Sequence, residues 1–176
     1  MRRVRFSVAM SLDGYIAGPN GEIDWIVIDP DIDFRALMGA FDTVLLGRKT
    51  YEVTRQHGSG GMPGMQAYVF SRTLHQADCP GVIVSDNPSE TLATLKTSQG
   101  KDIWLFGGGS LFRSLLELGL VDAVEVAVIP ELLGGGLPLL PQPAKHAKLG
   151  LVKHRVYEKT GTVSLEYALP SSRPRR

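Results

Sequence analysis

The stretch Ile103-Trp104-Leu105-Phe106-Gly107-Gly108-Gly109-Ser110-Leu111-Phe112 contains the strongest structural signal in this chain. Its apolar run predicts a buried strand that ends at three glycines, and Ser110 then opens an amphipathic helix. Glycines at such a turn let the backbone come close to a ligand, and the N–H groups at the helix start suit a phosphate. A tight turn with a serine N-cap explains the same residues equally well, so other segments must decide.

The composition is that of an ordinary globular protein. The 176 residues, with 43% hydrophobic and 21% charged residues, predict a single domain over residues 1–170. The net charge of +1 gives no reason to expect binding to nucleic acid or to an acidic membrane surface. The single cysteine, Cys79, excludes an internal disulfide, and we expect it to pack as a small apolar side chain.

The sequence contains no targeting, membrane or metal signal. Met1 is followed by a strand pattern instead of the apolar core of a signal peptide, and no segment approaches the ~18 apolar residues of a membrane span. No Cys/His cluster has the spacing of zinc ligands. We therefore expect a cytoplasmic protein without a metal, and a frayed basic tail over residues 171–176.

Strand and helix patterns alternate through the middle of the chain, which predicts an α/β fold with a mostly parallel central sheet. We expect strands near residues 4–10, 43–46, 67–70, 82–84, 103–106 and 123–129. Helices are expected near residues 31–40, 88–97 and 110–118 and from residue 48, and a surface loop over 58–64. Segments 149–157 and 162–169 flank Lys159-Thr160-Gly161, which predicts a C-terminal antiparallel hairpin.

Three polar loops follow apolar strands of this predicted sheet: Gly47-Arg48-Lys49-Thr50, Ser71-Arg72-Thr73 and Gly107-Gly108-Gly109-Ser110. Parallel sheets bind ligands beyond the carboxyl ends of their strands. The arginines of these loops are planar, permanently charged donors that match phosphate oxygens, and the hydroxyls add further donors. A solvated surface charge explains any one of the arginines, whereas three matching loops favour a ligand with several phosphates.

Two common phosphate motifs are absent. A P-loop requires a glycine directly before its lysine, and Arg48 precedes Lys49 instead. The dinucleotide fingerprint of Rossmann domains requires a third glycine where Phe112 stands. The predicted phosphate site therefore belongs to another fold.

Four segments in this order resemble a known family: Ser11 to Ala17 (SLDGYIA), Leu46 to Glu52 (LGRKTYE), Phe70 to Thr73 (FSRT) and Phe106 to Ser110 (FGGGS). They are similar to the dihydrofolate-reductase-like fold, and most of all to the C-terminal reductase domain of the riboflavin-biosynthesis deaminase/reductase (RibD type). Residues 129–139 (IPELLGGGLPL) resemble a segment typical of that branch. The resemblance covers about residues 3–169 and implies a three-layer αβα architecture.

The resemblance implies an NADPH site. Gly47, Arg48, Lys49 and Thr50 would hold phosphate groups, and Ser71, Arg72 and Thr73 would lie near the adenosine ribose phosphate. Phe106, Gly107, Gly108, Gly109, Ser110 and Leu111 would follow the pyrophosphate and nicotinamide, and a cis peptide commonly joins the glycine pair in this fold. Ala9, Ile16 and Ala17 would line the nicotinamide pocket. Domains of this type also tend to be homodimers.

Reduction of a C=N or C=O bond requires a proton donor besides the hydride, and Asp13, Asp24, Asp31 and Asp33 are the candidates. Asp33 opens the first helix about where dihydrofolate reductases place the acid that binds the pterin. Asp13 resembles a position typical of the riboflavin-type branch. Helix capping explains Asp33, and turn formation before Gly14 explains Asp13, without any catalytic role.

The sequence thus predicts an NADPH-dependent reductase of a small heterocyclic or carbonyl substrate, such as a riboflavin-pathway ribosylamino-pyrimidine. The alternative is a non-catalytic nucleotide-binding module that keeps the cofactor cleft. A true dihydrofolate reductase is disfavoured, because the Pro-Trp pair before the first helix is absent and Asp24-Trp25 stands roughly there. A flavin enzyme is also disfavoured, since no flat aromatic site is evident.

Overall fold

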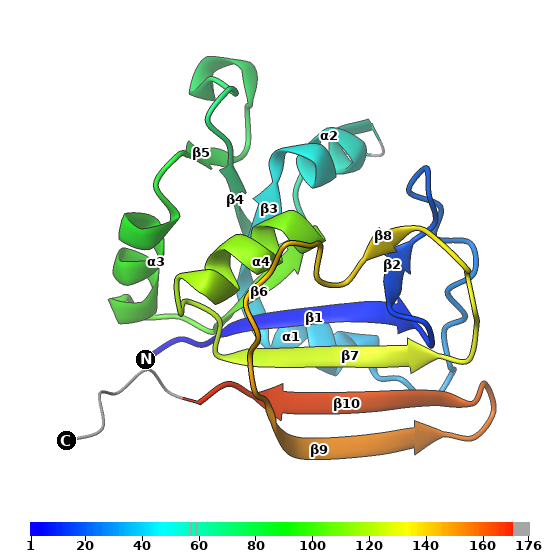
Figure 1. The fold of residues 1–176 in the computed structure, drawn as a ribbon. Helices are drawn as coiled ribbons and strands as arrows, with labels where there is room; N and C mark the ends of the chain where they lie inside the picture. The colour runs from blue at the N-terminus through cyan, green and yellow to red at the C-terminus, as the bar shows by residue number, and fades with distance from the viewer. Residues whose placement is uncertain (57, 59, 171–176) are drawn as a thin grey trace.

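The computed structural model of the chain describes residues 1–56, 58 and 60–170. The predicted tail at residues 171–176 lies outside this range, as does one position of the predicted loop over 58–64. Eight strands of the described part form one sheet, in the order β5-β4-β3-β6-β1-β7-β10-β9 (Figure 1). Their bounds are β1 Val4–Ser11, β3 Phe41–Gly47, β4 Gln66–Phe70, β5 Ile83–Ser85, β6 Asp102–Gly107, β7 Ala123–Ile129, β9 Gly150–Tyr157 and β10 Thr162–Ala168.

The sheet is parallel from β5 to β7 and antiparallel at its other edge. All pairs from β4–β5 to β1–β7 are parallel, while β10 pairs antiparallel with both β7 and β9. The α/β fold and the C-terminal hairpin are therefore confirmed. Two short strands, β2 (Tyr15–Ala17) and β8 (Leu137–Pro138), form a separate antiparallel pair.

Helices cover both faces of the sheet, as the three-layer expectation requires. One hydrophobic cluster joins the sheet to α3 (Pro88–Thr97) and α4 (Gly109–Glu117), and includes a stacked pair of rings, Phe6 and Phe112, with centroids 4.0 Å apart. A second cluster joins the opposite face to α1 (Phe34–Gly39) and α2 (Arg48–Gln56). Cys79, next to the short 3-10 helix η1 (Gln76–Asp78), is fully buried in it, as expected of a small apolar side chain.

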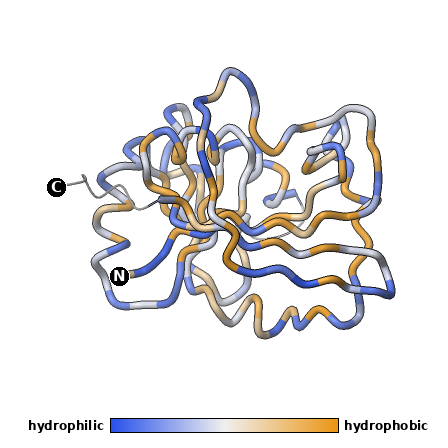
Figure 2. The backbone as a smooth tube through the Cα atoms, turned by 60° about the horizontal axis from the view of Figure 1, so that its bottom comes forward, coloured by the Kyte–Doolittle hydropathy of each residue, from blue (hydrophilic) through white to orange (hydrophobic). Residues whose placement is uncertain are grey.

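Hydrophobic and hydrophilic residues alternate at short intervals along the backbone (Figure 2). This is the pattern of strands and helices that each bury one face. Within the part of the chain that is described, no helix combines the length and the apolar composition needed to cross a membrane.

Helix α4 begins one residue earlier than Ser110. Its N-cap is Gly108, and no side chain caps the helix, so a capping role for Ser110 is wrong. Because no side chain caps α4, the backbone N–H groups of its first turn can donate hydrogen bonds to a ligand beyond the edge of the sheet. Helix α1 is shorter than residues 31–40, because Asp33 caps it and residues 18–33 form an irregular segment across the sheet.

Candidate functional site

The three predicted loops lie side by side. They follow β4, β3 and β6, which are consecutive neighbours in the sheet and run in the same direction. Gly47 ends β3, Gly107 ends β6, and Ser71 comes directly after β4. Parallel strands bring their carboxyl ends to one edge, so the structure assembles the three loops there as the sequence predicted.

Two of the loops approach each other at glycines that have no side chain. We call the site between Gly47 and the Gly107-Gly108 pair the glycine cradle. A Cβ atom placed on Gly47 would lie 3.6 Å from the Gly107 carbonyl oxygen and 3.6 Å from Leu111 Cβ. A Cβ on Gly108 would lie 3.4 Å from Thr50 Oγ1. Gly107 has φ +148°, a conformation that favours glycine, and a cis peptide joins it to Gly108, as the resemblance implied. The absent side chains leave room for a ligand that approaches both backbones.

Gly109 has a different role. A Cβ there would lie 2.7 Å from the Pro138 carbonyl oxygen and 2.9 Å from Pro141 Cδ. This glycine allows the segment after β8 to pack against the start of α4. Of the three consecutive glycines, the first two face the neighbouring loop and the third is needed for packing.

The charged side chains of the loops are available at the surface. Arg48 forms an ion pair with Glu52 one helical turn along, at 2.8 Å, and both side chains are about half exposed. Exposed pairs of this kind contribute about 0.3–0.5 kcal/mol, so a phosphate can compete for Arg48. Lys49 and Arg72 are exposed. Among the described residues, no ion pair or hydrogen bond holds the Arg72 side chain.

The Ser71 loop is shaped by its own hydroxyl. Ser71 Oγ accepts hydrogen bonds from the backbone N–H groups of Thr73 and Leu74, both at 3.1 Å. The Ser71 N–H donates to the Ser85 carbonyl oxygen at 3.0 Å, which ties the loop to the end of β5. This turn holds Arg72 outward at the same sheet edge as the glycine cradle.

A cavity of about 490 Å³ lies on the α1 face of the sheet. Ala9 lines it, whereas Ile16 and Ala17 lie on β2 and are not among its lining residues. One wall is α1 with the segment before it, and it is mainly apolar: Ile26, Val27, Ile28, Ile32, Phe34, Leu37 and Met38. The other wall is the face of β1, β7, β10 and β9, and it carries most of the polar side chains.

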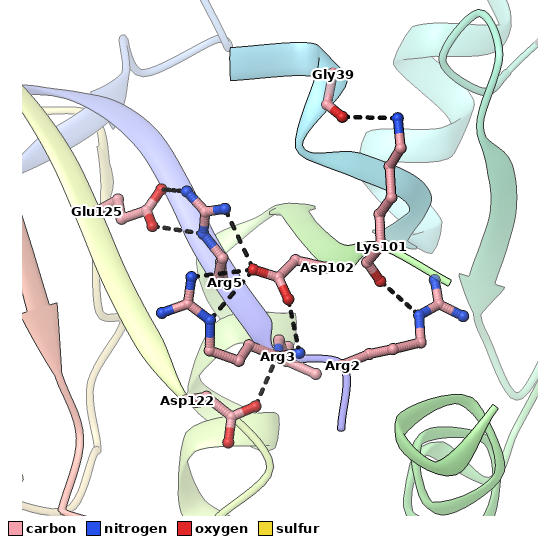
Figure 3. Close-up of polar contacts among 9 residues, drawn as sticks. Arg2, Arg3, Arg5, Gly39, Lys101, Asp102, Asp122 and Glu125 are labelled. Atoms are coloured by element: carbon pink, nitrogen blue, oxygen red, sulfur yellow. Dashed lines mark hydrogen bonds and ion pairs between the residues drawn. The ribbon is translucent and has the colours of Figure 1, made fainter. Parts of the chain in front are cut away.

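An arginine anchors that polar wall (Figure 3). Arg5 donates to both carboxylate oxygens of Glu125, at 2.6 and 3.0 Å, and to Asp102 at 3.3 Å. Burial acts to lower the pKa of Arg5, but the carboxylates of Glu125 and Asp102 together raise it. Because one guanidinium holds both Glu125 oxygens, the Glu125 side chain is fixed on the cavity wall.

The sequence prediction missed Arg5 and Glu125. They are 120 positions apart, and only the sheet order brings them together. The available signal was a single charged residue inside each apolar strand, in Val4-Arg5-Phe6 and in Val124-Glu125-Val126. A charge at an alternate position of a buried strand requires a partner on the same face.

A second, more open depression lies at the opposite edge of the sheet, around the start of β1. Its cations already have partners. Arg2 donates to the Lys101 carbonyl oxygen at 2.6 Å, Lys101 Nζ donates to the Gly39 carbonyl oxygen at 2.8 Å (Figure 3), and Lys96 pairs with Asp122. We interpret this network as structural, because it ties the N-terminal segment to the ends of α1 and α3.

Comparison with known proteins identifies the family to which this fold belongs. The family model of the RibD C-terminal domain matches residues 2–163. This chain belongs to that family. An uncharacterized protein of Bacillus subtilis, YyaP, is 35% identical over 178 residues, which cover 94% of each protein.

Solved structures give the same fold for this RibD C-terminal domain. A protein from Shewanella sp. PV-4, described as a riboflavin biosynthesis protein, superposes with TM-score 0.80 and 26% identity, covering 97% of this chain and 99% of that one. A deaminase/5-amino-6-(5-phosphoribosylamino)uracil reductase from Thermotoga maritima gives TM-score 0.71 and 19% identity, covering 96% of this chain and 57% of its own. A dihydrofolate reductase from Enterococcus faecalis with NADP(H) gives TM-score 0.70 and 20% identity, covering 95% and 96%.

The two favoured acids of this RibD C-terminal domain have different surroundings. Asp33 lines the cavity, and its carboxylate accepts the Ala36 N–H at 2.9 Å, so it caps α1 as well. Asp13 does not line the cavity, and it binds Ser11 Oγ at 2.6 Å and the N–H groups of Gly134 and Leu133 at 2.8 and 3.1 Å.

These contacts determine the state of Asp13. The hydrogen bond from the Ser11 hydroxyl, helped by the backbone N–H groups of Gly134 and Leu133 against a smaller effect of desolvation, lowers the pKa of Asp13. Both oxygens of the Asp13 carboxylate are held by these donors, and the side chain lies outside the cavity. The geometry therefore favours a positioning role, in which Asp13 fixes the turn after β1 to the segment before β8.

The remaining aspartates of the segment before α1 do not line the cavity. Asp31 pairs with Lys159 at 2.8 Å, and Asp24 is exposed. Asp29, which the sequence prediction did not single out, is fully buried and accepts hydrogen bonds from the Thr160 hydroxyl at 2.9 Å and the Thr160 N–H at 3.2 Å. It joins the apolar cavity wall to the tip of the β9–β10 hairpin. No cluster of three or more potential metal ligands occurs among the residues described.

Proposed function

We propose that this RibD C-terminal domain is an NADPH-dependent reductase that transfers a hydride to a small heterocyclic or carbonyl substrate. One observation carries the proposal: the cradle between Gly47 and the Gly107-Gly108 pair lies at the edge of the same sheet whose face forms the cavity at Ala9. The NADP(H) complex of the Enterococcus dihydrofolate reductase, which has this fold, supports the choice of cofactor.

The residues fit such a cofactor. Because Gly47, Gly107 and Gly108 have no side chains, a pyrophosphate can approach the backbone closely, and the uncapped start of α4 offers N–H donors to it. Arg48, Lys49 and Arg72 are exposed cations at the same edge. Bound NADPH supplies the hydride. The chain itself aligns the two reactants and excludes water with the apolar wall around α1.

Asp33 is the proton donor that we propose. Among the four aspartates predicted as candidates, it alone lines the cavity. Its bond to the Ala36 N–H fixes one carboxylate oxygen, which leaves the other oxygen for a substrate. Asp13 would act only through the loop that it positions.

The finer proposal concerns the substrate. Reduction of a ribosylamino-pyrimidine is supported by the likeness to the Thermotoga reductase, which acts on 5-amino-6-(5-phosphoribosylamino)uracil according to its name. A non-catalytic nucleotide-binding module is the second candidate, and one observation favours it: Asp33 caps a helix and Asp13 holds a loop, as purely structural acids would.

The decisive experiment titrates the protein with NADPH and NADH and follows the fluorescence of the bound nucleotide. We expect NADPH to bind well below the millimolar range. Absence of binding by either nucleotide at millimolar concentration would exclude the cofactor and with it the reductase. Loss of NADPH absorbance on addition of a heterocyclic or carbonyl substrate then separates the two candidates, because a binding module holds NADPH without oxidising it.

A further inference from the structure

Most of the apolar wall of the cavity belongs to a segment without helix or strand. We call the part of this segment from Pro19 to Ile32 the strap. Four apolar side chains of the strap line the cavity: Ile26, Val27, Ile28 and Ile32. The strap ends at Asp33, which is the N-cap of α1 and the proton donor proposed above. The position of the strap therefore determines how far the apolar wall and Asp33 stand from the sheet.

Helix α1 is too short to hold Asp33 in place by itself. It has six residues, and none of its side chains is fully buried. Helices of fewer than about 12 residues are marginal without outside contacts. The C-terminal end of α1 has such a contact, because Lys101 Nζ donates to the Gly39 carbonyl oxygen at 2.8 Å. The N-terminal end, with Asp33, depends on the strap.

Burial of apolar side chains holds the strap only weakly. Ile23, Val27 and Ile28 are 63%, 50% and 60% exposed. Apolar burial stabilises in proportion to the area removed from water, so these side chains contribute little while the cavity is empty of substrate. The polar contacts of the strap therefore decide its position.

Those polar contacts lead to one place. Within the part of the chain that is described, every hydrogen bond or ion pair between the strap and residues other than Gly18 and α1 goes to the turn of the β9–β10 hairpin (Figure 1). Asp29 Oδ2 accepts hydrogen bonds from the Thr160 hydroxyl at 2.9 Å and the Thr160 N–H at 3.2 Å. The second contact, Asp31 with Lys159, is an exposed ion pair and contributes little. We call the contact of Asp29 with Thr160 the clasp.

The clasp is tightly connected to Asp33 through the strap. Asp29 Oδ1 accepts the Asp31 N–H at 2.9 Å, and the Asp29 carbonyl oxygen accepts the Ile32 N–H at 3.1 Å. These bonds close a compact turn directly before Asp33. A change in the position of Asp29 is therefore passed on to Asp33 and to the start of α1.

On its other side, the clasp is connected to the polar wall of the cavity. The Gly161 N–H donates to the Tyr157 carbonyl oxygen at 2.9 Å and closes the hairpin turn. The hydroxyl oxygens of Thr160 and Thr162 lie 2.9 Å apart, and Thr162 is fully buried. Tyr157 lines the cavity. The clasp thus joins the two walls of the cavity through two rigid turns.

The clasp itself touches neither reactant. Asp29 and Thr160 are not among the residues that line the cavity. The predicted cofactor loops follow β4, β3 and β6, whereas the hairpin forms the opposite edge of the sheet. An effect of the clasp on the reaction must therefore pass through the strap.

We propose that Asp29 and Thr160 are positioning residues, which hold the strap against the hairpin and so set the distance of Asp33 and the apolar wall from the sheet face. This inference rests on the reductase proposed above, because the role of Asp33 comes from it. It adds two residues outside the cavity on which the proton transfer depends.

The first test measures hydrogen–deuterium exchange of the whole protein by mass spectrometry, without nucleotide. Thr160→Val removes the hydroxyl donor but keeps the N–H and the shape of the side chain, and Asp29→Asn removes the charge. In both variants the amides of residues 19–39 should exchange about tenfold faster, which is the effect of losing a hydrogen bond to a charged group. Exchange in α4 should stay unchanged. Thr160→Ser keeps the hydroxyl and should exchange like the wild type.

The second test measures turnover per bound cofactor. NADPH oxidation is followed with 5-amino-6-(5-phosphoribosylamino)uracil, the compound in the name of the Thermotoga reductase, and the rate is divided by the number of NADPH sites in the same sample. Thr160→Val and Asp29→Asn should lower this rate about ten- to a hundredfold, because small displacements of a reacting group are costly. The affinity for NADPH should not change.

The control variant is Lys159→Met, which breaks the exposed ion pair between the same hairpin and the same strap. It should leave exchange and turnover close to those of the wild type, as should Thr160→Ser. Unfolding of a variant lowers the number of NADPH sites and the total rate together, so the rate per site separates positioning from stability.

Faster exchange confined to residues 19–39, together with a lower rate per site, would support the clasp. Unchanged exchange there, faster exchange throughout the chain, or an unchanged rate per site would overturn it. The two proposals fail separately. If the wild type binds NADPH but does not oxidise it with this compound, the proposed substrate fails, and the exchange measurement still decides whether the clasp holds the cavity wall.

Discussion

At the scale of single residues, Arg72 provides the sharpest test of cofactor choice. Arg72→Ala should weaken NADPH binding by about 1–3 kcal/mol, through loss of charge-assisted hydrogen bonds to the ribose phosphate. NADH lacks that phosphate, so its binding should barely change. Fluorescence titration of both nucleotides measures the difference, with Arg35→Ala as a control in an equally exposed arginine. Equal losses for the two nucleotides would contradict the role assigned to Arg72.

Gly47 distinguishes a functional glycine from a structural one. A Cβ there has only ordinary contacts, 3.6 Å from Gly107 O and from Leu111 Cβ, and Gly47 is not among the glycines with positive φ. Gly47→Ala should therefore fold with unchanged or slightly raised stability, by up to about 1 kcal/mol. NADPH binding should weaken about tenfold or more, because the methyl group occupies the cradle.

Thermal melts and NADPH titration of the same Gly47→Ala sample check both halves of this prediction. Gly39→Ala serves as the control, since nothing lies within 4 Å of its added Cβ. A melting temperature of Gly47→Ala well below that of the wild type would show that Gly47 is needed for packing. An NADPH affinity equal to that of the wild type would show that the cradle does not bind the cofactor.

Asp33 is the proposed proton donor. Asp33→Asn keeps an oxygen that can accept the Ala36 N–H, so α1 should persist, but the amide has no acidic proton to supply. Turnover should fall by about 10²–10⁴-fold, while NADPH binding stays unchanged. Steady-state kinetics with any substrate that oxidises NADPH provide the measurement. Unchanged turnover of Asp33→Asn would show that Asp33 is not the proton donor.

At the scale of elements, helix α4 packs on the sheet through a buried face that includes Phe112. Phe112 is 4% exposed and stacks on Phe6 of β1. Phe112→Ala should lower the free energy of unfolding by about 3–5 kcal/mol, measured by urea denaturation. Leu118→Ala, at an exposed position of the helix end, should change it by about 0.5 kcal/mol or less. Similar losses at both positions would mean that α4 is not held by this core.

The contact between the segment before α1 and the β9–β10 hairpin should depend on pH. Burial acts to raise the pKa of Asp29, but the hydrogen bonds from Asp31 and Thr160 and the charge of Lys159 bring it below its ordinary value of 3.8. A carboxylate with a lowered pKa contributes stability above the pKa of the unfolded chain and loses it as the pH falls through the folded pKa. The contribution is therefore complete at neutral pH and disappears in acid.

Asp29→Asn tests this contact. The variant should melt below the wild type at pH 7, and the difference should shrink as the pH falls below about 4. Melting temperatures across that range measure it, with Asp24→Asn, at an exposed position, as the control. Parallel curves for the wild type and Asp29→Asn would show that the Asp29 charge does not stabilise the fold.

At the scale of the whole molecule, local patterns predicted the elements but not their order across the sheet. The alternation near Val4 and the cap at Asp33 are local, and the elements lie close to where they were expected. The pairing of Arg5 with Glu125 depends on β1 lying beside β7 in the sheet. No short segment of the sequence gives that information. The same holds for the cavity wall, because Ala9 of β1 and Arg155 of β9 share it only through two intervening strands.

The candidate site was predicted where backbone chemistry is local and missed where it is not. Each glycine loop can be recognised within four residues of sequence, whereas the polar wall of the cavity can be recognised only when the order of the strands is known. The homodimer implied by the resemblance stays a prediction. So does the cytoplasmic location.

The parallel and antiparallel parts of the sheet are expected to bind different molecules. Cofactor contacts are expected on loops after β4, β3 and β6, while the far part of the substrate wall belongs to the antiparallel strands β10 and β9. The two groups share only the strands between them. In the reductase proposed above, changes in the hairpin should therefore alter the choice of substrate without altering the choice of nucleotide, which makes the hairpin the natural place to redesign substrate specificity.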